Sequence, residues 1–171
     1  MRELTIKKYA RHGIVRRWQT RGENEMSITL KRKISEYVLH PEGGPYSAVL
    51  SEIRSHEGVE TAYGVKDRLQ LTFQTTEKTP DNDRPMTICI FLNATLNEKG
   101  RLMGLLAQQV PAMELAELVS DGKEVNIEGL LIGTQWLLTV EHNESNGKTY
   151  DNVTNLMKAP PEQHLKPWKE N

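Results

Sequence analysis

The side chains best suited to chemistry in this chain are polar residues that alternate with apolar ones. Between Lys66 and Thr76 the apolar residues recur at every second position, and the polar series between them is Arg68, Gln70, Thr72 and Gln74. Successive side chains of a strand point to opposite faces, so this pattern predicts a polar face opposite a buried one. Phe91, in a later apolar run, adds a flat ring. Cations that attract phosphates and rings that stack on bases are what single-stranded nucleic acid requires.

Two further places could supply contacts of the same kind. Tyr63 precedes the alternating run, and Lys148 and Tyr150 flank the Asn146-Gly147 turn. The predicted nucleic-acid contacts are therefore Tyr63, Lys66, Arg68, Gln70, Thr72, Phe91, Lys148 and Tyr150. Each charge has the alternative of being an ordinary solvated side chain, and Phe91 that of packing against a helix. Trp136 aligns with Leu138 and Val140 and is predicted to be a core residue.

Motifs for other chemistry are absent from the sequence. It has no Walker-type glycine loop, GxGxxG, paired CxxC or HExxH, so nucleotide-driven motors and zinc hydrolases have no support. His142, Glu144 and Asp151 could be drawn as a metal or acid/base cluster, but the polar tip of a hairpin accounts for them. The single cysteine, Cys89, is expected to be a buried, inert thiol. We expect no enzyme, no catalytic residue, no metal and no cofactor.

The elements that must position these residues have a simple order. The segment 126–159 is predicted to be a β-hairpin, because Asn146-Gly147 separates two runs rich in strand-forming residues. The predicted strands are 46–53, 66–76, 86–92, 136–140 and 150–156. Before the last two strands, the sequence predicts a helix over 98–109, capped by Asn97, and a helical segment over 113–119. Three strands, a helical insertion and two strands are the order of a five-stranded, partly open Greek-key barrel, the OB fold. Another small barrel or sandwich with an inserted helix is the alternative.

Charge is distributed unevenly along the 171 residues. Residues 1–33 hold ten Lys/Arg and three Asp/Glu, a net charge of +7, whereas residues 34–171 have a net charge of −8. The basic extension could contact phosphates. Alternatively, translation begins at Met26, which an intact-mass measurement of the natively expressed protein would decide. We divide the chain into this extension, 1–33, a main domain, 34–159, and a flexible C-terminal tail, 160–171.

Several segments together resemble a known family. They are Pro41 to Leu50, Tyr63 to Phe73, Leu96 to Leu102, and Leu131 to Val153 with a gap after Gly133. Over about residues 34–160 the chain resembles small phage and prophage proteins from replication and recombination gene clusters, which are taken to be OB-fold proteins that bind single-stranded DNA. The resemblance implies non-catalytic DNA binding in a bacterial or phage-infected cytoplasm. Residues 163–171 lack the acidic run with a hydrophobic tip through which better-known single-strand binders recruit partners.

The acidic main domain keeps a second interpretation open. Net negative charge opposes attachment to DNA, so an OB-like module that docks on a replication or recombination protein is the alternative. No apolar run approaches the roughly 18 to 20 residues of a membrane span, and no apolar block follows the N-terminal basic residues as in a secretory signal, so we expect a cytoplasmic protein without a membrane partner. An exposed edge strand would allow a homo-oligomer.

Overall fold

The computed structural model describes residues 37–120 and 122–169. The basic extension and the alternative start at Met26 lie outside the described residues. The strands and helices of the described residues belong to one compact unit, Val38–Asn171.

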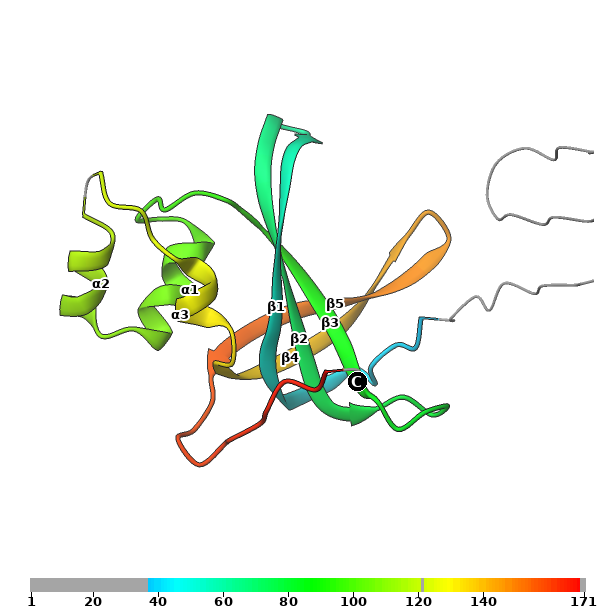
Figure 1. The fold of residues 1–171 in the computed structure, drawn as a ribbon. Coiled ribbons are helices and arrows are strands. Elements are labelled where there is room, and N and C mark those ends of the chain that lie inside the picture. Colours follow the sequence, from blue (N-terminus) through cyan, green and yellow to red (C-terminus); the bar gives the residue numbers. More distant parts are fainter. Residues whose placement is uncertain (1–36, 121, 170–171) are drawn as a thin grey trace, which may run out of the picture. The chain divides into compact units, whose positions relative to one another are not determined.

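Five strands form one antiparallel sheet (Figure 1). They are β1 (Gly43–Thr61), β2 (Gly64–Lys78), β3 (Pro85–Asn93), β4 (Gln135–Ser145) and β5 (Lys148–Lys158). Their order across the sheet is β3-β2-β1-β4-β5, with the helices inserted between β3 and β4. The prediction of a mainly β chain with five strands and a helical insertion is therefore confirmed.

The predicted barrel is not closed. β3 and β5 are the two edges of the sheet, and no ladder of hydrogen bonds joins them. Helix α1 (Arg101–Gln109) lies against both edges and places Leu102, Leu105 and Leu106 in the core. Apolar packing of a helix thus covers the region where a closed barrel would have a further strand pairing.

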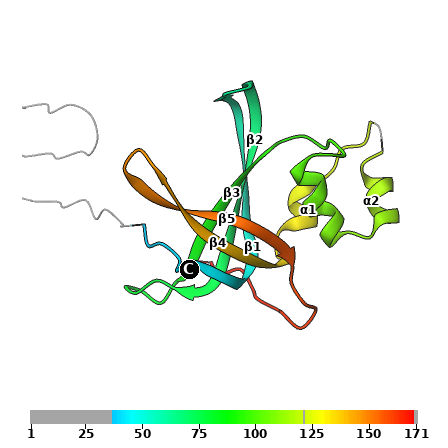
Figure 2. The same cartoon turned by 180° about the vertical axis from the view of Figure 1, so that it is seen from behind.

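Two predictions need correction, the cap of the first helix and the start of the hairpin. Asn97 does not cap α1; its side chain accepts from the backbone N–H of Lys99, and α1 begins after Gly100. Residues 127–131, predicted to be part of the hairpin, form helix α3 (Ile127–Leu131) because the Asn126 side chain accepts from the N–H of Gly129 as an N-cap. Helix α2 (Ala112–Leu118) overlaps the predicted helical segment. Both views place the three helices together, away from the end of the β4–β5 hairpin (Figure 1, Figure 2).

The core lies between the inner face of the sheet and the helices. Trp136, Leu138 and Val140 of β4 are all fully buried, as predicted, and Trp136 meets Phe73 of β2 edge to face at 6.1 Å. The Trp136 Nε1–H donates to the Thr134 hydroxyl at 2.8 Å, which satisfies the polar end of this side chain. Among the described residues, no helix is long and apolar enough to cross a membrane.

β1 is longer than predicted and contains an irregularity. It continues to Thr61, so the polar residues after Ile53, expected to end the strand, belong to a long hairpin with β2. The pairing shifts between Leu50 and Glu52, which is a β-bulge at Ser51. The Ser51 hydroxyl donates to the Thr72 carbonyl at 3.0 Å and links the bulge to β2.

Candidate functional site

Strands β1, β2 and β3 present one continuous polar surface on the side of the sheet opposite the core. We call it the outer face. It consists of Glu52, Arg54 and His56 of β1, Arg68, Gln70, Thr72 and Gln74 of β2, and Thr87, Cys89, Phe91 and Asn93 of β3, which pair across the strands. The residues between them, such as Leu71 and Ile90, are buried in the core. The alternation of β2 therefore produces the two faces that the sequence predicts.

Phe91 is the aromatic centre of the outer face. It is 48% exposed, and its ring lies 5.6 Å from the Arg68 guanidinium carbon and 6.1 Å from the His56 ring. It contacts these side chains rather than serving as a core residue. A base stacked on Phe91 would therefore have a guanidinium and an imidazole beside it, and an arginine over an aromatic ring is a favourable cation–π pair.

Arg68 retains hydrogen-bonding capacity. Its Nη2 donates to the Phe91 carbonyl at a long 3.4 Å, and its Nε is buried without a hydrogen-bond partner among the described residues. A guanidinium has five N–H donors in a fixed fork. The buried Nε is out of reach of a ligand, so a phosphate or a base edge would be met by the Nη N–H groups that do not bond to Phe91.

Polar contacts hold the side chains around Phe91 in place. The Gln70 Oε1 lies 2.9 Å from His56 Nε2, and the Gln70 amide nitrogen donates to Cys89 Sγ at 3.3 Å. Because the amide oxygen can only accept, the proton of this pair must be on His56 Nε2. The Thr72 hydroxyl lies 3.4 Å from the same sulfur. Cys89 was expected to be buried; instead it is partly exposed on the outer face.

Arg54 forms an ion pair with Glu52 on the outer face. Its Nε donates to Glu52 Oε1 at 2.8 Å, and that hydrogen bond, with the charge of the carboxylate, raises the pKa of Arg54. Both side chains are well exposed, so solvent screens the pair and a phosphate can compete with the carboxylate. The carboxylate of Glu52 nevertheless reduces the net positive charge of the β1 part of the outer face.

The predicted contact residues fall into three places. Arg68, Gln70, Thr72 and Phe91 lie together on the outer face. Tyr63, 87% exposed, lies at the end of the β1–β2 hairpin with the Lys66 ammonium 5.7 Å from its ring. Lys148 and Tyr150 lie on the β4–β5 hairpin, whose end is separate from that of the β1–β2 hairpin (Figure 1).

Sequence reasoning missed Arg54 and His56. Both belong to the part of β1 that was expected to be a polar loop. The signal was present, because Glu52, Arg54 and His56 alternate with Ile53 and Ser55. Only the pairing with β2 identifies this stretch as strand.

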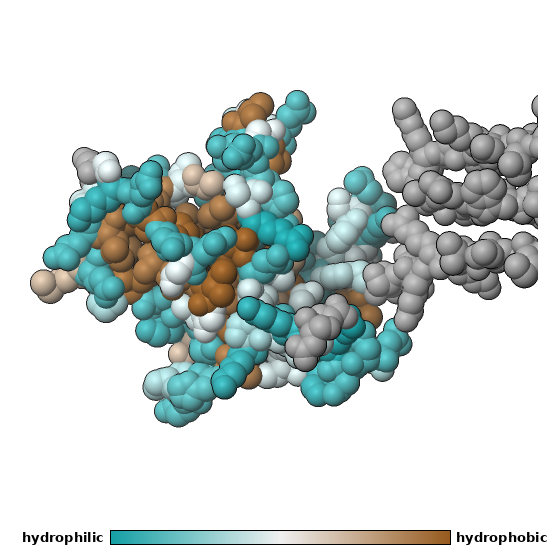
Figure 3. Space-filling model, viewed as in Figure 1, coloured by the Kyte–Doolittle hydropathy of each residue, from teal (hydrophilic) through white to brown (hydrophobic). Residues whose placement is uncertain are grey.

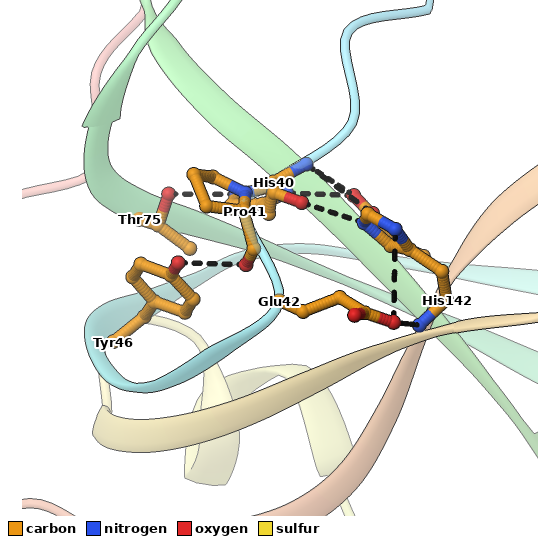
Figure 4. Close-up of polar contacts among 7 residues, drawn as sticks. His40, Pro41, Glu42, Tyr46, Thr75 and His142 are labelled. Carbon is orange, nitrogen blue, oxygen red and sulfur yellow. Dashed lines mark hydrogen bonds and ion pairs between the residues drawn. The ribbon is translucent and has the colours of Figure 1, made fainter.

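A second polar cluster, the His40 network, is built around the buried side chains of His40 and Thr75, and its contacts are drawn in Figure 4. His40 Nδ1 lies 2.7 Å from Asp151 Oδ2, and its Nε2 lies 2.9 Å from the Thr75 hydroxyl. The His40 backbone N–H also donates to both carboxylate oxygens, at 3.1 and 3.2 Å. The His40 and Asp151 side chains are fully buried.

The network extends to β4 and to the start of β1. His142 Nε2 donates to the His40 carbonyl at 2.7 Å, and the His142 N–H donates to Glu42 Oε1 at 3.0 Å. Tyr46 donates its hydroxyl proton to the Pro41 carbonyl at 2.7 Å. Burial, followed by the carboxylates of Glu77 and Asp151, raises the pKa of Tyr46 and so favours this protonated donor.

The hydroxyl, imidazole and carboxylate of the His40 network have the order of a nucleophilic triad. Thr75, however, is only 4% exposed, and its hydroxyl is also within 3.4 Å of the Met86 carbonyl. A substrate cannot reach it in this arrangement. The network instead ties the segment before β1 to β2, β4 and β5. No group of three or more His, Cys, Asp or Glu side chains in the described part of the chain is arranged to hold a metal ion.

No protein-family model matches this sequence, and no curated protein matches it. The outer face and the His40 network must therefore be interpreted from their geometry alone.

Proposed function

We propose that residues 34–159 form an OB-like module that binds single-stranded DNA on the outer face without catalysing a reaction, in phage-type replication or recombination. The order β3-β2-β1-β4-β5, with helices between β3 and β4, is that of an OB barrel opened between its third and fifth strands. OB folds bind oligonucleotides on the face of strands 2 and 3 and with the loops that join strands 1–2 and 4–5.

The observation that carries this proposal is the half-exposed Phe91 ring with Arg68 against it and His56 beside it. It offers stacking and positive charge at one point, which is the combination that binds bases and phosphates without reading sequence. The positions of Tyr63 and Lys66 at one hairpin end, and of Lys148 and Tyr150 on the other, agree with the two ligand-gripping loops of the fold.

Binding to a fluorescein-labelled dT oligomer, followed by anisotropy, tests the proposal. If three cations contact phosphates, Arg54 and Arg68 of the outer face and Lys66 of the β1–β2 hairpin, the slope of log affinity against log salt should be about −2, so affinity falls roughly 20-fold between about 50 and 200 mM salt. A duplex of the same length is the control and should bind more weakly, because its bases are not free to stack. Absence of binding at micromolar protein and low salt would exclude the function.

Replacing the ring tests the site. Phe91→Ala should weaken dT binding by about 5- to 150-fold, since a stacked base contributes about 1–3 kcal/mol. Phe91→Trp should bind at least as well as the unaltered protein. Met113, which is 84% exposed on α2, gives the matched control Met113→Ala, expected to leave affinity unchanged. Equal affinity of the Phe91→Ala and unaltered proteins would remove Phe91 from the site.

A protein-interaction module is the second candidate, and one observation favours it. Apolar surface gathers over the helical part of the molecule (Figure 3). Met113 of α2 is 84% exposed, and Ile132, directly after α3, is 42% exposed. Apolar patches of this kind often mark protein–protein contacts. A replication or recombination protein would then be the partner, and the anisotropy experiment separates the two functions because this one predicts no affinity for dT.

A further inference from the structure

Residues 160–169, expected from composition to be a flexible tail, make specific contacts with the sheet. The Gln163 amide donates to the carbonyls of Ala48 and Trp136, at 3.0 and 3.3 Å. The Gln135 side chain accepts from the Leu165 N–H and donates to the Leu165 carbonyl, both at 2.9 Å. Each of these bonds satisfies a polar group of a segment that has no strand partner of its own.

Gln74 repeats this arrangement on β2. Its Oε1 accepts from the Trp168 N–H at 2.7 Å and its Nε2 donates to the Trp168 carbonyl at 3.0 Å. Gln135 and Gln74 both pair with Val49 of β1, one from each side, and Val49 is only 2% exposed. The C-terminal segment therefore runs over one row of the sheet, from β4 across β1 to β2, on the side of the outer face.

These contacts place Trp168 on the same face of the sheet as Phe91. Trp168 is 43% exposed, and the Arg84 guanidinium carbon lies 5.2 Å from its ring. Phe91, with Arg68, has the same composition: a half-exposed ring and a guanidinium. Two pairs of an aromatic ring and an arginine are thus present, one on the outer face and one formed by Trp168 of the C-terminal segment with Arg84.

The two pairs lie along the direction of β2. Phe91 is paired with Gln70, and Trp168 is held by Gln74, four residues further along the strand. Four residues of strand span about 13 Å. Thr72 lies between Gln70 and Gln74 on the same face of β2. The C-terminal segment contacts the sheet beside Gln74, so the surface around Thr72, Gln70 and Arg68 remains available to a ligand. The exposed Lys166 and Lys169 add positive charge beside Trp168.

We propose that Trp168, with Arg84, is a second base-stacking site, and that one single strand of nucleic acid passes over the outer face from Phe91 to Trp168. The C-terminal segment is then part of the binding surface and not a separate tail. This inference rests on the proposed function, because it assigns the same ligand to a second position on the same face.

Affinities for two lengths of labelled dT separate the sites. Trp168→Ala should weaken binding of dT15 by at least about fivefold, and should leave binding of dT3 unchanged, because a trimer can occupy the Phe91 site alone. Trp168→Phe should retain most of the affinity for dT15, since it keeps an aromatic ring. The doubly substituted Phe91→Ala, Trp168→Ala protein should bind dT15 more weakly than either single variant.

A fluorescence measurement covers the case in which Trp168→Ala disturbs the fold. In a Trp18→Phe protein the remaining tryptophans are the buried Trp136 and the exposed Trp168. Addition of dT15 should quench the fluorescence and protect it from acrylamide, whereas Met113→Ala in the same background should behave identically to its parent.

Different results overturn different claims. Unchanged dT15 affinity of Trp168→Ala, with weakened affinity of Phe91→Ala, overturns the second site and leaves the proposed function in place. Tighter binding after Trp168→Ala also overturns it, because the segment would then compete with DNA. No binding of dT15 by the unaltered protein overturns both.

Discussion

His40→Ala should lower the free energy of unfolding by about 3–5 kcal/mol, which is the usual cost of breaking a buried pair by removing one of its two side chains. The substitution removes the imidazole between Asp151 and Thr75, and the side chains of His40 and Asp151 are fully buried. The carboxylate keeps the backbone N–H of residue 40 but loses the 2.7 Å hydrogen bond to the imidazole. A cavity the size of the ring adds to the cost.

Urea unfolding followed by circular dichroism measures this loss. His40→Asn, whose amide can still donate to Asp151, should lose clearly less. The exposed His164 provides the matched control, and His164→Ala should change stability by no more than about 0.5 kcal/mol. If His40→Ala were as stable as His164→Ala, the His40 network would not contribute to holding the strands together.

Trp136→Ala should be about as destabilising, again by about 3–5 kcal/mol. The indole is fully buried, packs edge to face against Phe73 and satisfies its own N–H on Thr134. Its removal leaves a large cavity between β2 and β4 that rigid neighbours can only partly fill. The Thr134 hydroxyl also loses a donor.

Trp136→Phe is the graded comparison in the same denaturation experiment. It keeps an aromatic ring beside Phe73 but loses the hydrogen bond to Thr134, so its loss should lie between those of the unaltered protein and Trp136→Ala. Trp168→Ala removes the same side chain from a half-exposed position and should cost much less. Similar losses for the two tryptophans would contradict the assignment of Trp136 to the core.

Local patterns in the sequence predicted the face that we propose binds DNA. Leu69, Leu71 and Phe73 alternate with polar residues without interruption, and this period of two specifies which side of β2 is buried. The position of Phe91 opposite Ile90 and Leu92 results from the same rule. Where alternation is regular, the sequence is sufficient to assign a face.

Contacts between distant residues could not be predicted in this way. His40 and Asp151 are 111 positions apart, and nothing near either residue indicates the other. The C-terminal segment illustrates the same limit, because its polar composition is typical of a solvated tail. Its contacts with the sheet are made by the amides of Gln74 and Gln135, which bind its backbone. Glutamine at a surface position gives no sign that it will do so.

The β-bulge at Ser51 changes which residues of β1 face the core. Before the bulge, even-numbered residues such as Ala48 and Leu50 point into the core, and after it the buried residue is odd-numbered, Ile53. Without the extra residue, Arg54 and His56 would point into the apolar interior. One unpaired serine thus allows a single strand to supply core residues from its first half and the imidazole and guanidinium of the outer face from its second.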